Sequence, residues 1–240
     1  MKPDAAGLAT RRRRLIGGGY PRPVAGMPGY PDRVRAFADR ADAGRILASH
    51  LGHLIESHPL VLGIPRGGVV VAAEVAAGLR GELGAVIAGK VRAPGNDELA
   101  IGAVAPGGVT LVDELFVRRL GIGVEELHAA ISDAVTELER REAVFGRAPA
   151  VADRTVIVVD DGVATGATLR AALGYARRGG PQRLVCAVPV GPPATIDLIT
   201  LEVDEVVCPV QPDRLMAVGE WYEDFAQVSD ETVLRLLQDG

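Results

Sequence analysis

Two adjacent aspartates and the turn of small residues after them form the segment with the clearest chemical character. They lie in TVIVVDDGVATGAT, residues 155–168, where Asp160 and Asp161 directly follow four apolar β-branched residues. Successive side chains at the end of a strand point to opposite sides. The pair therefore suits several hydroxyl hydrogen bonds, or hydrated Mg²⁺, better than one shared bare metal ion. This pattern predicts a polyol site where a strand ends.

The turn after the aspartates has the composition of an anion site. Its small residues let backbone N–H groups close around an anion at the start of the next helix, and Thr165 and Thr168 add hydroxyl donors. The residues concerned are Ala164, Thr165, Gly166, Ala167 and Thr168. In the structural alternative these side chains only cap the turn, which explains one acid and one threonine but not two of each. Ribose hydroxyls beside a phosphate would match both halves of the segment.

The elements around this segment predict an α/β fold. Residues 156–159 are apolar without alternation and too short for a helix, which indicates a strand buried on both faces of a mostly parallel sheet. Such sheets bind ligands at the carboxyl ends of their strands, where the two acids fall. Further strands are expected at residues 60–64, 84–89, 183–190 and 205–210. Helices are expected from residue 32 to before Pro59, at residues 69–79, 124–145, 169–178 and 194–200, and after a cap at Ser229 or Asp230.

The organisation of the chain predicts one compact domain and an extension. Residues 1–31 are rich in Gly, Pro and Arg and lack periodicity, so we expect a flexible N-terminal arm or a wrapping extension there, and a single domain over residues 32–240. Residues 90–110 begin polar and carry several glycines, as a functional loop over a site would. The helix at residues 124–145 interrupts the strand–helix alternation and is expected to be part of an insertion, residues 123–146.

Composition and charge exclude several classes of protein. A net charge of −5 over 240 residues argues against broad binding to nucleic acid backbones, although four arginines at residues 11–14 form a local basic cluster. Cys186 and Cys208 lie in apolar stretches without metal or disulfide spacing, which favours a reduced, cytoplasmic setting. The four histidines do not combine into a metal site and are expected on helix surfaces. We expect neither a membrane span nor a secretory signal.

The segment VIVVDDGVATGAT, residues 156–168, resembles the phosphoribosyl pyrophosphate (PRPP) signature of type I phosphoribosyltransferases. The resemblance implies the Rossmann-like fold of that family: a central parallel sheet flanked by helices and a small hood, here expected partly from residues 209–228. It also implies that Asp160 and Asp161 hold the ribose hydroxyls and Mg²⁺, directly or through water, and that residues 164–168 hold the 5′-phosphate. Gly162 stands where the family more often has an aliphatic residue, which would loosen the turn.

Two further segments extend the resemblance. PRGG, with Arg66, Gly67 and Gly68, is similar to the family's pyrophosphate loop, which often contains a strained peptide bond, and Lys90 and Arg92 resemble the start of a flexible catalytic loop. That loop, residues 90–105, would close over PRPP. In order, PRGG, APGNDELAIGA, VDDGVATGAT and VGEWYEDF are similar over residues 35–238 to an uncharacterised phosphoribosyltransferase-like family of bacteria and archaea, sometimes joined to a hydrolase domain.

The resemblance implies transfer of a phosphoribosyl group from PRPP to an acceptor, with Mg²⁺ as cofactor and pyrophosphate as product. Ala164 replaces an aspartate that interacts with 6-oxopurines, so adenine, a pyrimidine or another amine remain open as acceptors. Trp221, Tyr222 and Phe225 would stack on a planar acceptor or, in the structural alternative, anchor the tail. A non-catalytic PRPP or nucleotide sensor and a sugar-phosphate hydrolase are the alternative functions. Relatives commonly form homodimers, and the inserted helix offers an interface.

Overall fold

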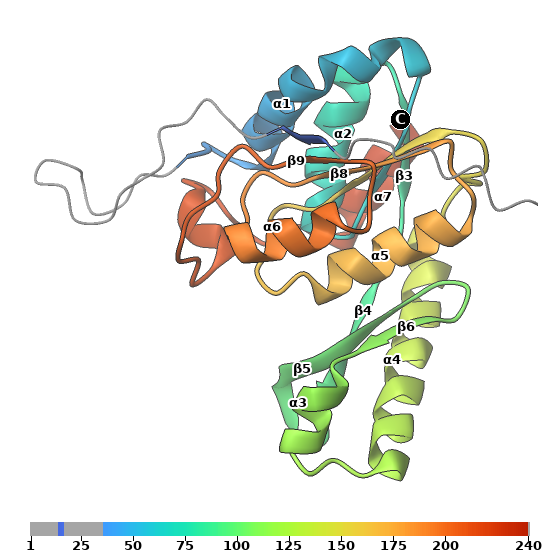
Figure 1. Ribbon diagram of the computed structural model, residues 1–240. Coiled ribbons are helices and arrows are strands. Elements are labelled where there is room, and N and C mark those ends of the chain that lie inside the picture. Colours follow the sequence, from blue (N-terminus) through green and yellow to red (C-terminus); the bar gives the residue numbers. More distant parts are fainter. Residues whose placement is uncertain (1–13, 17–35, 240) are drawn as a thin grey trace, which may run out of the picture.

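Six parallel strands form the central sheet of the computed structural model, which describes residues 14–16 and 36–239 (Figure 1). Their order is β1-β9-β8-β7-β2-β3. The strands are β1 (Arg14–Ile16), β2 (Leu60–Gly63), β3 (Glu82–Ala85), β7 (Thr155–Val159), β8 (Arg183–Ala187) and β9 (Glu205–Val207). The carboxyl ends of these strands lie at one edge, as the apolar runs of the sequence predicted.

Helices cover both faces of this sheet (Figure 1). The helices of this body are α1 (Arg40–Leu51), α2 (Gly67–Leu79), α5 (Ala167–Arg178), α6 (Pro193–Thr200) and α7 (Asp230–Asp239). In β7, Val156 and Val158 pack in the layer of α5 and α6, whereas Ile157 and Val159 pack in the layer of α1 and α2. The strand is apolar on both sides because both sides are covered, and it ends where the acid pair begins.

A limb of residues 89–145 projects from the body (Figure 1). It contains antiparallel strands β4 (Gly89–Ala93), β5 (Asn96–Ala105) and β6 (Val109–Val112) and helices α3 (Glu114–Arg119) and α4 (Val124–Phe145). The helix expected at residues 124–145 is confirmed as α4. The prediction of a loop at residues 90–110 is wrong, because strands β4, β5 and β6 occupy this segment. Its polar residues lie at the exposed tip of the β4–β5 hairpin, and the small residues that follow are buried against α4 and α5.

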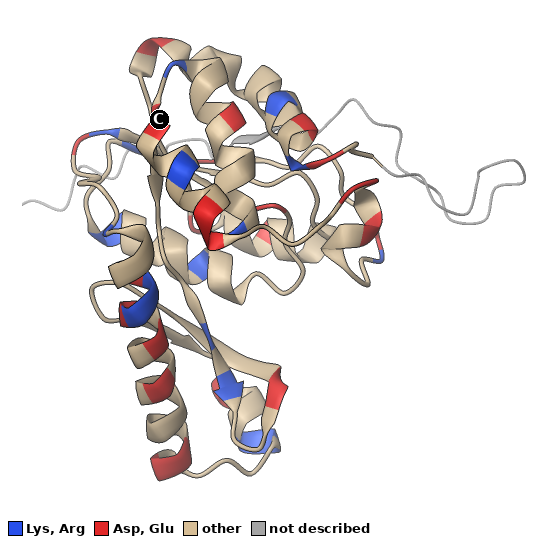
Figure 2. Cartoon of the chain, turned by 180° about the vertical axis from the view of Figure 1, so that it is seen from behind, with Lys and Arg blue, Asp and Glu red and all other residues tan. Residues whose placement is uncertain are grey.

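Charged residues of both signs are interspersed over the body and along α4 (Figure 2). No helix in the described ranges is long and apolar enough to cross a membrane. Cys186 and Cys208 are buried free thiols in the core, as expected, and burial raises the pKa of each.

Several boundaries differ from the expectation for reasons of capping and pairing. The first helix begins at Arg40 rather than near residue 32, because the Asp39 side chain accepts the Asp42 N–H at 2.7 Å and caps it. It then continues as a 3₁₀ helix, η1 (Gly52–Ser57), to just before Pro59. The second strand begins two residues earlier than expected, at Glu82, and ends at Ala85, where its pairing with β2 stops.

The two ends of the described chain also join the body. Residues 14–16 fall in the expected arm and form β1 beside β9, so for these three residues the structure agrees with a wrapping extension rather than a flexible arm. The rest of that arm, residues 1–13 and 17–31, lies outside the described residues. At the other end, the expected cap of α7 is confirmed at Ser229, whose Oγ accepts the Thr232 N–H at 3.1 Å.

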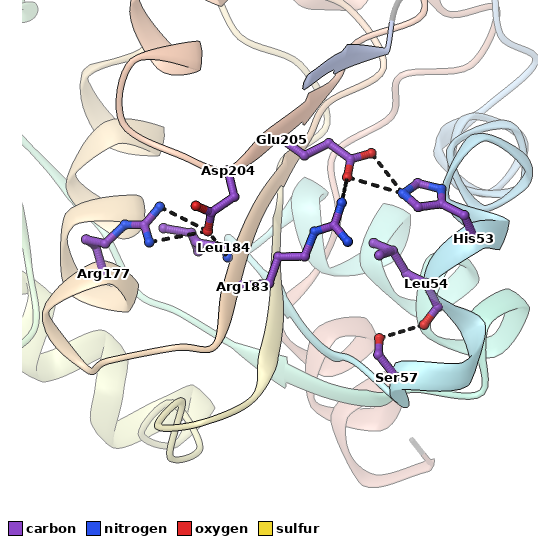
Figure 3. A network of polar contacts seen from close by, with 8 residues as sticks. All are labelled: His53, Leu54, Ser57, Arg177, Arg183, Leu184, Asp204 and Glu205. Carbon is purple, nitrogen blue, oxygen red and sulfur yellow. Dashed lines mark hydrogen bonds and ion pairs between the residues drawn. The ribbon is translucent and has the colours of Figure 1, made fainter. Parts of the chain in front are cut away.

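A buried carboxylate lies at the amino ends of the strands (Figure 3). Glu205, the first residue of β9, has a fully buried side chain and lies 2.5 Å from Arg183 Nη2 and 3.1 Å from His53 Nε2. A buried charge requires such partners. His53 is an exposed residue of η1, as expected for a helix surface, and its contact with Glu205 ties η1 to the sheet.

Candidate active site

A cavity of about 450 Å³ lies at the carboxyl end of β7. Asp160, Asp161 and Thr168 line it. Asp160 Oδ1 accepts the backbone N–H of Asp161 at 2.9 Å, while Asp161 Oδ2 accepts Arg40 Nε at 2.8 Å. The acids and the first turn of α5, which the sequence linked by pattern alone, therefore share one cavity.

The acid pair lies where the protein supplies too little positive charge and too few hydrogen bonds to offset the burial of two carboxylates. Burial raises the pKa of Asp160 well above its ordinary value, and the carboxylate of Asp161 raises it further. Burial also raises the pKa of Asp161, although the hydrogen bond from Arg40 counteracts this shift. Both shifts mean that the ionised pair would gain from more positive charge or more hydroxyl donors than the protein supplies.

We expect Asp160→Asn to increase the free energy of unfolding of the ligand-free protein at neutral pH. The folded-state pKa of Asp160 lies above the unfolded value of about 3.9, so the wild type loses stability as pH rises between these two values. Asparagine does not titrate and still accepts the Asp161 N–H. Chemical denaturation at several pH values should show a difference that is small below about pH 3.9 and grows toward neutrality. A variant less stable than the wild type at pH 7 would contradict this.

Two glycines bring the loop after β2 against the acid pair. A Cβ built on Gly67 would lie 1.9 Å from Asp161 Oδ2, and one built on Gly68 would lie 2.8 Å from the Val159 carbonyl oxygen. Only a residue without a side chain permits so close an approach. The peptide bond Pro65–Arg66 at the start of the loop is cis. The PRGG segment thus forms one wall of the cavity that the acids line.

Three cations predicted from the sequence line the same cavity, namely Arg66, Lys90 and Arg92. Lys90 and Arg92 are two residues apart on β4 and so share a face of the strand. Arg66 Nη1 lies 3.5 Å from Asp230, whereas Lys90 and Arg92 have no ion-pair partner within the described part of the chain. The cavity therefore places uncommitted positive charge across from the acid pair.

Sequence reasoning missed several residues that line this cavity, among them Arg40, Arg141, Gln227 and Val228. Arg40 is almost fully buried: besides its bond to Asp161 it donates to the Ala226 carbonyl at 2.8 Å, and its guanidinium lies 3.7 Å above the Phe225 ring. Arg40 and Asp161 are 121 positions apart, so no local pattern relates them.

The turn before α5 is open at the helix N-terminus. Gly166 adopts a φ of +82° and precedes a helix that has no side-chain cap, so its first N–H groups are available to an anion. Thr195 Oγ1 donates to the Ala164 carbonyl at 2.8 Å and supports the turn from behind. Of residues 164–168, Thr168 lines the cavity, while Ala164 and Thr165 are exposed beside it.

The glycine that departs from the family pattern does not loosen this turn. A Cβ built on Gly162 would lie 2.4 Å from Val218 Cγ1, and the next residue, Val163, donates its N–H to the Val190 carbonyl at 2.8 Å. Glycine is required here because the first residue of η2 (Val218–Trp221) packs directly on the turn. The expectation of a looser turn is therefore wrong.

The three aromatic residues proposed for the acceptor form a cluster behind the acids. The Tyr222 ring is buried between Phe37 and Phe225, with centroid distances of 5.2 and 4.9 Å, and its hydroxyl donates to the Asp161 carbonyl at 2.5 Å. The Trp221 carbonyl accepts the N–H of Phe37 at 3.1 Å. Trp221, Tyr222 and Phe225 are not among the described residues that line the cavity. This arrangement favours the anchoring alternative.

We expect Tyr222→Phe to destabilise the protein by roughly 1 to 3 kcal/mol, because the buried Asp161 carbonyl would lose its hydrogen-bond donor. Urea denaturation measures this change. Tyr175→Phe is the matched control, since the half-buried Tyr175 hydroxyl has no hydrogen-bond partner within the described residues. Equal effects of the two substitutions would show that the Tyr222 hydroxyl bond adds nothing to stability.

The donor set at the acids fits Mg²⁺ only if a substrate shares the ion. Mg²⁺ is usually bound by one or two carboxylates, several waters and substrate phosphates. Within the described residues there is no group of three or more His, Cys, Asp or Glu side chains that could hold a metal. The raised pKa of Asp160 nevertheless indicates a place where a cation would be stabilised. Two carboxylates at the edge of a cavity are the appropriate protein contribution to such a shared ion.

A second cavity, of about 950 Å³, continues from the first along the limb. It runs beside α4 and the tip of the β4–β5 hairpin, and the two cavities share Arg66, Lys90, Arg92 and Arg141. The cations therefore lie at the junction of the limb with the body.

The fold and the site define a Rossmann-like α/β protein with a charged ligand cleft at the carboxyl ends of its parallel strands. The family model of the phosphoribosyl transferase domain matches residues 38–221, and the chain belongs to this family. Its fold is that of the type I phosphoribosyltransferases, as the signature at residues 156–168 predicted.

Individual relatives agree with this assignment. The chain is 39% identical over 207 residues to "Putative phosphoribosyl transferase Rv0571c" of Mycobacterium tuberculosis H37Rv, and equally to "Putative phosphoribosyl transferase MT0597" of strain CDC 1551. These matches cover 85% of this chain but 47% of each relative, so the chain spans about half their length. Among solved structures, TT1426 from Thermus thermophilus is 42% identical with a TM-score of 0.70, over 85% of this chain and 98% of that one.

Proposed function

We propose that this chain transfers the 5-phosphoribosyl group of PRPP to a nucleobase or amine acceptor and releases pyrophosphate. The observation that carries the proposal is the 450 Å³ cavity, in which the acid pair and Thr168 lie together with three cations from the PRGG segment and β4. Membership of the phosphoribosyl transferase family supports the class of reaction.

In the proposed complex the ribose hydroxyls donate to Asp160 and Asp161, and the 5′-phosphate binds the open N-terminus of α5. Hydrogen bonds to ionised acceptors are among the strong ones, and hydroxyl donors would relieve the electrostatic cost that raises the pKa of both acids. The positive end of the α5 dipole and the hydroxyls of Thr165 and Thr168 favour a phosphate there.

The diphosphate would lie among Arg66, Lys90 and Arg92. As the bond from C1 to the diphosphate breaks, positive charge develops on the ribose and negative charge on the leaving group. The cations stabilise the negative charge on the leaving diphosphate. The acids hold the ribose, on which the positive charge develops, in place. Mg²⁺ bound at Asp160 and Asp161, directly or through water, would neutralise part of the diphosphate charge. The three cations and both acids line the same cavity.

The acceptor would enter beside the segment that follows the aromatic cluster. Gln227 and Val228 line the cavity and offer an amide side chain and an apolar surface. Ala164 carries no ionisable group, which disfavours a 6-oxopurine acceptor and leaves adenine, a pyrimidine or another amine.

The test is incubation of the full chain with PRPP and Mg²⁺ against a panel of nucleobases and amines, with mass detection of pyrophosphate and of ribosylated product. A product that depends on one acceptor supports the proposal. Pyrophosphate released equally without any acceptor would show a hydrolase. Tight PRPP binding without turnover of any panel member would show a sensor, and the absence of PRPP binding would refute the site itself.

A further inference from the structure

Arg141 links the limb to two separate segments of the body. It lies near the C-terminal end of α4, and its half-buried guanidinium donates to the Pro65 carbonyl through Nη2 at 2.8 Å and reaches the Ala88 carbonyl through Nη1 at 3.4 Å. Pro65 opens the PRGG segment, whereas Ala88 ends the stretch that leads from β3 into β4. One planar side chain thus ties together the stretches of backbone that follow the neighbouring strands β2 and β3.

Both bridged stretches carry cations of the candidate site. Arg66 directly follows Pro65, and Lys90 is the second residue after Ala88. All of these residues, and Arg141 itself, line the 450 Å³ cavity. A guanidinium presents its N–H groups in a rigid fork, so two bonds to two carbonyls fix the separation of the groups that it joins.

The surroundings of Arg141 make its positive charge electrostatically unfavourable. Burial lowers the pKa of Arg141, and the nearby charge of Arg66 lowers it further, whereas Glu137 has the opposite effect. An arginine remains protonated despite such shifts. Like charges held this close are disfavoured unless something compensates them, and an anion at the junction of the two cavities would do so.

We propose that Arg141 is a positioning residue that sets the spacing between the PRGG segment and β4, and thereby shapes the subsite for a diphosphate. The inference rests on the proposed function, because it assigns the cations around Arg141 to a diphosphate. The inference adds a role for the limb, because the end of α4 holds the two sides of the diphosphate subsite in place through Arg141. The acids and the turn before α5 are held by other hydrogen bonds, in which Arg141 takes no part.

The test compares two ligands that occupy different halves of the site. Pyrophosphate needs the cations, whereas ribose 5-phosphate needs the acids and the turn before α5. Calorimetry with Mg²⁺ present should show that Arg141→Met and Arg141→Lys each weaken pyrophosphate binding about tenfold to a hundredfold, the effect of losing one or two hydrogen bonds from a charged donor, and leave ribose 5-phosphate binding unchanged. Retained ribose 5-phosphate binding also shows that each variant is folded.

Arg140→Met is the matched control, because the neighbouring Arg140 pairs with Glu137 at 2.7 Å and is mostly exposed. It should leave both affinities unchanged. Full pyrophosphate affinity in Arg141→Lys would show that charge alone matters and would overturn the positioning role, as would equal losses for both ligands. A wild type that binds neither ligand would refute the proposed function instead, and one that binds only ribose 5-phosphate would remove the diphosphate subsite and this inference with it.

Discussion

A chain carrying both Asp160→Asn and Asp161→Asn should bind PRPP on the order of a thousandfold more weakly than the wild type while remaining folded. Each carboxylate is expected to accept hydroxyl hydrogen bonds of the ribose, and a hydrogen bond to a charged group contributes about 1.5 to 3 kcal/mol. Asparagine keeps an acceptor for the two contacts that the structure records, the Asp161 N–H and Arg40 Nε, so the local fold should survive. Calorimetry measures the affinity and circular dichroism the fold.

Asp133→Asn is the control for a general effect of charge, since Asp133 lines only the second cavity, on α4. It should leave PRPP affinity within about twofold, because a single charge at an exposed site changes little. Unchanged PRPP affinity in the double variant would refute the assignment of the ribose to the acid pair, even if the chain proved to be active.

Lys90→Ala should lower kcat by about 10² to 10³, with a smaller loss of PRPP affinity. Lys90 lines the cavity, has no ion-pair partner within the described residues, and lies close enough to Asp160 to counteract the rise in its pKa. Its ammonium group is therefore available to stabilise the negative charge that develops on the leaving group. Steady-state kinetics and calorimetry on the same variant separate the two quantities.

Arg118→Ala controls for the loss of a cation from the limb, because Arg118 is exposed on α3 and pairs with the exposed Glu114 at 3.2 Å. Its kinetics should match those of the wild type. If Lys90→Ala lowers PRPP affinity but leaves kcat unchanged, Lys90 stabilises the bound donor and the transition state equally and has no specific role in the transition state. That result would remove it from the proposed mechanism.

The sequence predicted the body of the fold because its signals are local. β7 is an unbroken apolar run that ends in charged residues, and each crossover helix follows its strand within a few positions. The sheet of the limb escaped prediction because β5 begins with polar residues at a hairpin tip and continues with glycine and alanine, which have little preference for strands. Its burial comes from α4 and α5, which lie far from it along the chain.

The candidate site divides in the same way. Its acids, PRGG segment and turn before α5 are short motifs and could be found in the sequence. Arg40 and Arg141 could not, since their partners are 121 and 76 positions away. The aromatic residues near the C-terminus were identified correctly as a group, but composition cannot distinguish rings that stack on a ligand from rings that pack on Phe37.

The short strand β1 has a consequence for the handling of the protein. It occupies the outer side of β9, where unpaired backbone groups would otherwise form a template for association with another copy. β1 is only three residues long, and a short outermost strand offers little to a further chain. Truncated forms that begin after residue 16 would uncover β9, and concentrated solutions of such forms would be the ones prone to aggregate.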